Sequence, residues 1–326
     1  MVRFVLLLSL LAGNRVETRL VGDEADAVLA ILAKRAAHQA ITGADWNRVF
    51  TSEGYVRLQK REHSMQRPFE NDAFKAFVTS DELLAKRESL AKTIDDWRHA
   101  DLTGAANRAL AYLPANATIH AKVYPVIKPA TNSFVFEVES DPAIFKYVDV
   151  EPRAAFEQTM SHEMHHVGYG TACPPAGVEL GDMVWLGAFG EGFATLAAAG
   201  GPQNDPMKNG DRPGLPEVWR REMAKYDENF AALQSFFLDV ANKKLTGDAA
   251  RKRAFEFFGL LGPWYSVGYK MAATIEQAFG RDAVIAAFCD QRTLMPTYNR
   301  AVDKLAVKLP KWDTRLTTLF SETPAH

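Results

Sequence analysis

The sequence predicts an α+β protein that is mainly helical, with a small sheet between two helical parts. Apolar residues recur at the helical period through most of the 326 residues, whereas β-branched and aromatic residues dominate 121–150. The chain is 47% apolar and 24% charged, an ordinary globular composition with material for a sizeable core. A net charge of −2 gives no general field for nucleic acid, so we expect no nucleic-acid partner.

Residues 1–18 have the pattern of a secretory signal peptide. Arg3 precedes an apolar run from Phe4 to Ala12, which is much shorter than the ~20 residues of a membrane-spanning helix. The cleavage signal is weak, and the alternative is a buried strand or first helix. We expect no stable membrane span and an extracytoplasmic protein, periplasmic or secreted; without cleavage of the leader it would be cytoplasmic.

Residues 19–114 are expected to form an N-terminal helical region. Asp23 is a candidate cap for a first helix, and 79–82 has the form of a capping box before Leu83. Leu113-Pro114 ends this region.

Residues 115–200 are expected to form the core that carries the chemistry. Segments 121–127, 133–138 and 143–150 predict three strands, with Pro125 placing the first at an edge or at a bulge. Pro152 then suits the first position of a helix with the apolar stripe Phe156, Met160, Met164 and Val167. Glycines at 168 and 170 are expected to end this helix, and 190–199 predicts a second one.

Residues 201–326 are expected to form a helical C-terminal subdomain. The stretch 202–216 is rich in Gly, Pro, Asn and Asp and predicts a loop. One long amphipathic helix is expected over 216–245, and shorter ones near 249–261, 263–279 and 283–288.

The first predicted helix of the core carries the pattern HExxH. His162 and His166, four residues apart, project from one helix face, and their imidazoles can reach a single zinc ion. Glu163 points near the same ion and can take a proton from water. His165 is an extra histidine, for which we expect an outer-shell or surface role.

A third ligand follows by elimination, and it is an acid. The only histidine after His166 is the last residue, and the extended metzincin spacing is absent. Cys173 would give a more closed, structural site. Of the acids Glu179, Asp182 and Glu191, we favour Glu191 because it opens a helix rich in small residues, which would let that helix approach the first closely. His₂Glu leaves one position open for water.

The two cysteines, Cys173 and Cys289, are too few for a disulfide framework. We favour two free or buried thiols. The alternative is one disulfide between the site loop and the C-terminal helices, which would need an oxidising compartment.

Three segments together resemble a known family. Residues 161–169, 191–195 and 262–272 resemble a poorly characterised bacterial family of zinc-dependent peptidases of the gluzincin, thermolysin-like type. The resemblance implies a gluzincin-like fold, one Zn²⁺ per chain on His162, His166 and Glu191, and Glu163 as general base. It also implies a peptide or protein substrate, with Tyr265 or Tyr269 stabilising the oxyanion; we favour Tyr265, and two core tyrosines are the alternative.

Two other functions stay open at this point. The same site would serve a zinc-dependent hydrolase of a non-peptide amide or ester. A non-catalytic protein that binds metal or a partner on a peptidase fold is the second alternative. The strand at 143–150 could offer an edge for an extended peptide. The oligomeric state is open.

Overall fold

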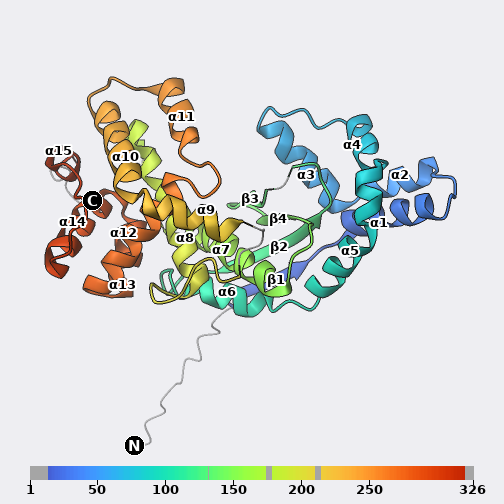
Figure 1. Cartoon of the computed structure of the whole chain (residues 1–326), viewed down its shortest axis with the longest axis horizontal. Coiled ribbons are helices and arrows are strands. Elements are labelled where there is room, and N and C mark those ends of the chain that lie inside the picture. The colour runs from blue at the N-terminus through green and yellow to red at the C-terminus, as the bar shows by residue number, and fades with distance from the viewer. Residues whose placement is uncertain (1–13, 131, 174–177, 210–213, 320–326) are drawn as a thin grey trace, which may run out of the picture.

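A computed structural model describes residues 14–130, 132–173, 178–209 and 214–319 (Figure 1). Most of the described chain is helical, and a four-stranded sheet lies between two helical parts, which confirms the α+β, mainly helical class. The first thirteen residues of the expected leader lie outside the described residues. Within the residues that the structure describes, no helix is both long and apolar enough to cross a membrane.

The sheet has one strand more than predicted. Its order is β1 (Val16–Leu20), β2 (Ile119–Val126), β4 (Ala143–Tyr147) and β3 (Phe134–Phe136). The first two pairings are parallel, and β3 runs antiparallel to β4. The sequence missed β1 because its residues were assigned to the leader, whose expected end at residue 18 falls inside this strand.

Two expectations about edges are wrong. Strand β2 is internal, and Pro125 is tolerated there because β1 pairs only as far as Val123. Strand β4 is internal too, so the edge on that side belongs to β3.

The two faces of β2 enter different apolar clusters, as the alternation of a strand requires. Ile119, Ala121 and Val123 join the cluster that contains helix α7 (Arg153–Ala172). Tyr124 and Val126 instead pack with Leu58 of helix α3 (Glu53–Ser64) on the opposite face. The sheet is therefore covered on both sides.

The N-terminal part holds six helices ahead of β2, as the structure describes it. They are α1 (Asp23–Ala36), α2 (Gly43–Phe50), α3 (Glu53–Ser64), α4 (Asn71–Val78), α5 (Asp81–Trp97) and α6 (Leu102–Leu110). Asp23 does not cap α1; its carboxylate accepts the Glu53 and Gly54 amides at the start of α3. The cap of α5 is Ser80, which accepts the Leu83 amide.

The C-terminal part is helical, as expected. Its helices are α8 (Gly190–Ala199), α9 (Leu215–Ala224), α10 (Tyr226–Ala241), α11 (Gly247–Glu256), α12 (Pro263–Phe279), α13 (Arg281–Cys289), α14 (Leu294–Leu305) and α15 (Thr314–Thr317). The single helix expected over 216–245 is two helices that meet at Lys225. Trp219 packs on Tyr269 whereas Phe230 packs on Trp312, so the two halves of the predicted stripe face different neighbours.

Two hydrophobic cores result. The N-terminal core joins α1, α4, α5 and α6 to the sheet and α7, and the C-terminal core joins α8 to the helices that follow it. Figure 1 shows α1–α5 at one end of the long axis and α10–α15 at the other, with α7 and α8 between them. The site residues therefore lie where the two cores meet.

Candidate metal centre

Helix α7 is fixed by its apolar stripe. Phe156 stacks on Trp97 with ring centroids 4.4 Å apart, and Met160, Met164 and Val167 are fully buried in the N-terminal core. The helix starts after Pro152 and runs to Ala172, past both glycines that were expected to end it. Gly168 serves packing instead, because a Cβ there would lie 2.4 Å from Leu113 and 3.2 Å from Ile119.

The opposite side of α7 presents the two histidines of the motif to α8. The Nε2 atoms of His162 and His166 are 3.2 Å apart. Glu191 reaches them from the first turn of α8, with its Oε2 3.1 Å from His162 Nε2 and 3.6 Å from His166 Nε2. The structure thus brings together the three residues that the sequence predicts as ligands.

Glycines let α8 pack closely against α12, rather than against α7 as we expected. A Cβ on Gly192 would lie 2.0 Å from the Tyr269 amide nitrogen, and one on Gly268 would lie 2.6 Å from the Phe189 carbonyl oxygen. Helices α8 and α12 therefore cross backbone to backbone at these two glycines. The small residues of α8 serve mainly this crossing with α12, and α12 holds Glu191 in place.

The donor set fits a metal cation. Atoms bound 2.0–2.1 Å from one ion at tetrahedral corners lie about 3.3 Å apart, close to the separations found here. In the described residues, His162, His166 and Glu191 form the one cluster of at least three such groups, with all ligand atoms within 4.8 Å of one another. Two imidazole nitrogens and a carboxylate are suitable zinc ligands.

Glu191 and His166 shift each other's ionisation. Burial disfavours the charged form of Glu191, but the charge of His166 and hydrogen bonds from both histidines outweigh it and lower the carboxyl pKa. Burial likewise lowers the pKa of His166, but Glu191 outweighs it and the net shift is upward.

Glu163 is a buried carboxyl beside this cluster. Its side chain lines a pocket of about 380 Å³, together with His162. Burial raises its pKa, although the neighbouring histidines counteract part of that effect. A carboxyl with a raised pKa, at the edge of a cavity, is suited to accept and return a proton.

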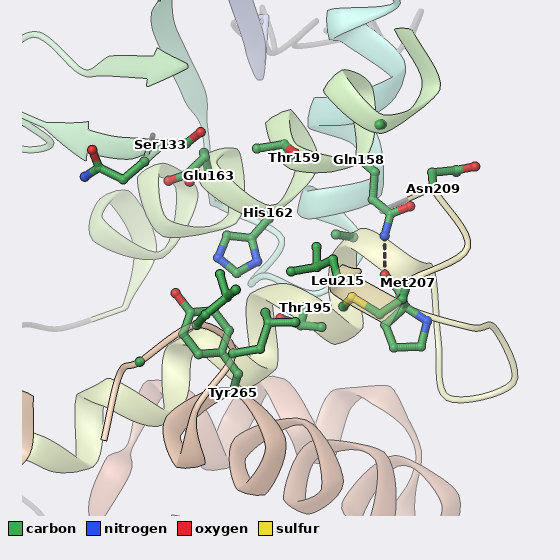
Figure 2. A pocket seen from close by; sticks show the side chains of 17 residues that line it. Ser133, Gln158, Thr159, His162, Glu163, Thr195, Met207, Asn209, Leu215 and Tyr265 are labelled. Carbon is green, nitrogen blue, oxygen red and sulfur yellow. Dashed lines mark hydrogen bonds between the residues drawn. The ribbon is translucent and has the colours of Figure 1, made fainter. Parts of the chain in front are cut away.

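The two candidate tyrosines differ in their position relative to this pocket. Figure 2 shows Tyr265 beside His162 at the cavity, and their ring centroids are 6.2 Å apart. Tyr269 does not line this pocket; it is buried against Trp219, with centroids 5.1 Å apart. The structure therefore places Tyr265 at the pocket and Tyr269 in the core, and the role of Tyr265 stays a prediction.

Much of the pocket could not be foreseen from local patterns. Its other walls come from the segment before β3, the N-terminal half of α7, helix α8 and the loop after it, the first residue of α9 and the turn before α12. The residues are Asn132, Ser133, Ala155, Gln158, Thr159, Thr195, Ala198, Pro206, Met207, Asn209, Leu215, Gly259, Leu260 and Leu261. Among the described residues that line the pocket, His162 and Glu163 are the only acidic or basic side chains, so the remaining walls are neutral.

Three further sequence predictions concern the surroundings. His165 is not on the surface: it is buried, and burial lowers its pKa to about 3. Cys173 cannot serve as a thiolate ligand, because it forms a disulfide with Cys289, contrary to the favoured prediction of two thiols. The side chains of the alternative ligands Glu179 and Asp182 lie outside the described part of the chain.

Comparison with known proteins gives one match. A family model with the description "Putative zinc dependent peptidase (DUF5700)" matches residues 33–307, which run from the last turn of α1 to beyond the end of α14. Neither a curated protein nor a solved structure matches the chain.

Proposed function

The chain belongs to this family of zinc dependent peptidases, and from that premise we propose a gluzincin-type metallopeptidase. One Zn²⁺ would be held by His162, His166 and Glu191. The observation that carries the proposal is the convergence of these three side chains from two helices beside the buried carboxyl of Glu163.

The chain's own residues would handle the protons. Zinc, when bound, supplies a Lewis acid that polarises a carbonyl group and lowers the pKa of water towards ~7. Glu163 accepts the proton of the attacking water and delivers it to the leaving amine. Its raised pKa makes it a stronger base for the first transfer than an exposed carboxylate.

Tyr265 would stabilise the charge that develops on the carbonyl oxygen. It lies beside His162 on the C-terminal side of the pocket, opposite the helix that carries Glu163. A phenol hydroxyl can donate a hydrogen bond to an oxyanion in a site from which water is partly excluded.

The substrate would be a peptide or protein chain laid along the pocket. The neutral walls favour an uncharged side chain next to the scissile bond. Ser133 lines the pocket immediately before the edge strand β3, so an extended peptide would have a strand to pair with there.

The disulfide supports an extracytoplasmic location. Cysteine pairs form and persist in the periplasm and outside the cell, and they are rare in the cytosol. This is the location that a secretory leader would give.

Purified protein, reconstituted with zinc, tests the mechanism against Glu163→Gln on an unfolded protein substrate. We expect the variant to keep stoichiometric zinc and to lose activity by about 10²–10⁴-fold, the usual contribution of general acid–base catalysis. Metal content is measured on the same samples.

Three results would reject parts of the proposal. Equal cleavage by both proteins would reject Glu163 as the base. Hydrolysis of small amides or esters without peptide cleavage would favour the non-peptide hydrolase. A wild-type protein that takes up no zinc on titration would favour a non-catalytic binding protein.

A further inference from the structure

Phe288 lies between the two helices that carry the ligands. On α7 its ring is 6.2 Å from the His165 ring and 4.6 Å from the Tyr169 ring, centroid to centroid. On α8 its ring stacks on Phe193 at 4.4 Å. One side chain thus contacts both ligand-bearing helices.

These contacts flank the ligands in sequence. His165 and Tyr169 are one helical turn apart and bracket His166. Gly190 and Phe193 bracket Glu191, and a Cβ on Gly190 would lie 2.8 Å from Phe288 Cζ. Phe288 therefore rests on the backbone of α8 next to Glu191, where only a glycine leaves room for the ring.

Glu191 is consequently held from two directions. Because Gly190 has no side chain, the Phe288 ring can pack against the backbone of α8 there. Gly192 likewise leaves room for the backbone of α12. The sequence Gly190-Glu191-Gly192 thus lets two neighbours reach the helix backbone on either side of the ligand. Packing this close leaves α8 little freedom to rotate or to move away from α7.

The position of Phe288 is itself anchored to α7. The next residue, Cys289, forms the disulfide with Cys173, which directly follows the last residue of α7. A second link lies just beyond, where Gln291 Nε2 donates to the Tyr169 hydroxyl at 2.9 Å. The end of α13 is therefore tied to α7 covalently and by a hydrogen bond.

We propose that Phe288, anchored by the Cys173–Cys289 disulfide, is a positioning residue that sets the separation of α7 and α8 at which His166 and Glu191 reach one ion. The inference rests on the proposed zinc site. It does not depend on peptide cleavage, because its measure is the affinity for the metal.

Zinc affinity of Phe288→Ala, measured by chelator competition, tests the proposal. We expect it to fall by about 10–100-fold, the usual effect of removing an outer contact of a metal site. The matched control is Phe236→Ala, which also removes a buried ring from the C-terminal core but contacts Phe237, Phe257 and Trp264 instead. The control should lower the urea midpoint of the metal-free protein while keeping the zinc affinity within about threefold.

Two further variants keep the test decisive if Phe288→Ala does not fold. Gly190→Ala should push the Phe288 ring away and weaken zinc binding. When Phe288 is already replaced by Leu, adding Gly190→Ala should weaken zinc binding little further, because both substitutions disturb the same contact. The double variant Cys173→Ser, Cys289→Ser should weaken zinc binding in the same direction. The visible spectrum of the cobalt-substituted protein should change in each, which a purely structural role would not cause.

The outcomes separate the two proposals. Wild-type zinc affinity in Phe288→Ala, or an equal loss in Phe236→Ala, would overturn the inference and leave the proposed function standing. A wild-type protein that binds no zinc would overturn the proposed function, and the inference with it.

Discussion

The two hydrophobic cores contribute different parts of the candidate metal centre. His162, Glu163 and His166 project from α7, whose other face is buried in the N-terminal core. Glu191 and Tyr265 come from α8 and α12, which belong to the C-terminal core. Two ligands thus share one helix, whereas the third depends on how two separately packed bodies meet.

This difference has a physical consequence for metal binding. The spacing within α7 is local and holds wherever that helix forms. The distance from α7 to Glu191 is set by tertiary contacts, namely the Gly192–Gly268 crossing and the Phe288 contact. A bound ion would in turn link the two cores, so metal binding and the stability of their junction should be coupled.

The largest effect is expected from removing the carboxylate of Glu191, the proposed ligand that the C-terminal core supplies. Glu191→Gln should lower zinc affinity by more than the roughly 10–100-fold that loss of an outer contact costs, and activity should fall with it. Competition with a chelator measures the affinity. Glu163→Gln is the matched control, because it changes a neighbouring buried carboxyl and should keep the metal. Zinc affinity unchanged in Glu191→Gln would show that another acid completes the site.

The sequence predicted the two halves of the site unequally, for this same reason. The HExxH spacing identified His162, Glu163 and His166 from local geometry alone. Glu191 could be predicted only by excluding other ligands. Its flanking glycines were expected to let α8 approach α7, but they make room for the backbone of α12 and for the Phe288 ring. Strand β1 was missed because its first three residues were assigned to the leader. The disulfide was only the less favoured alternative, because two cysteines 116 residues apart have no local signal.

The second comparison concerns the two tyrosines of the C-terminal core. Tyr265→Phe should lower kcat by about 10²–10³-fold if its hydroxyl stabilises the oxyanion, with zinc content unchanged. Tyr269→Phe, one turn further along α12 and outside the pocket, should change kcat only a few-fold. Steady-state kinetics on one peptide substrate compares them. Similar kcat values for the two variants would remove Tyr265 from the mechanism.

A smaller effect is expected at the helix crossing of the C-terminal core. Gly192→Ala places a Cβ 2.0 Å from a backbone nitrogen of α12, which cannot move aside as a side chain can. We expect a loss of about 3 kcal/mol in the free energy of unfolding, measured in urea on the metal-free protein. Gly43→Ala is the control, since no other group lies within 4 Å of the added methyl, and it should change stability by less than about 0.5 kcal/mol. Equal stability of the two variants would mean that α8 and α12 can separate without cost.

The two cores also differ in how they respond to pH, and here the expected effect is smallest. Outside the metal centre, the buried charged side chains of the described chain all lie in residues 24–151; they are Glu24, Arg57, Glu62, Lys128, Lys146 and Glu151. Burial raises the pKa of Glu24 from 4.5 to about 8, although its hydrogen bond from the Ile127 amide opposes the shift. The folded state therefore holds a proton that the unfolded state releases, and stability is lost as pH rises from about 4.5 to about 8.

Glu24→Gln should abolish that loss, because its amide oxygen can still accept the Ile127 amide and carries no charge to bury. Urea unfolding at pH 5 and pH 8 should show a smaller difference for the variant than for the wild type, with a gain at pH 8 on the order of 1 kcal/mol or more. Glu17→Gln, on the exposed side of β1, should keep the wild-type pH dependence. A pH dependence that Glu24→Gln leaves unchanged would mean that the carboxyl is ionised inside the N-terminal core, and some other group would have to neutralise it. The C-terminal core should not contribute in this range, since its buried tyrosines Tyr226 and Tyr298 have pKa values raised by burial and titrate only in strong alkali.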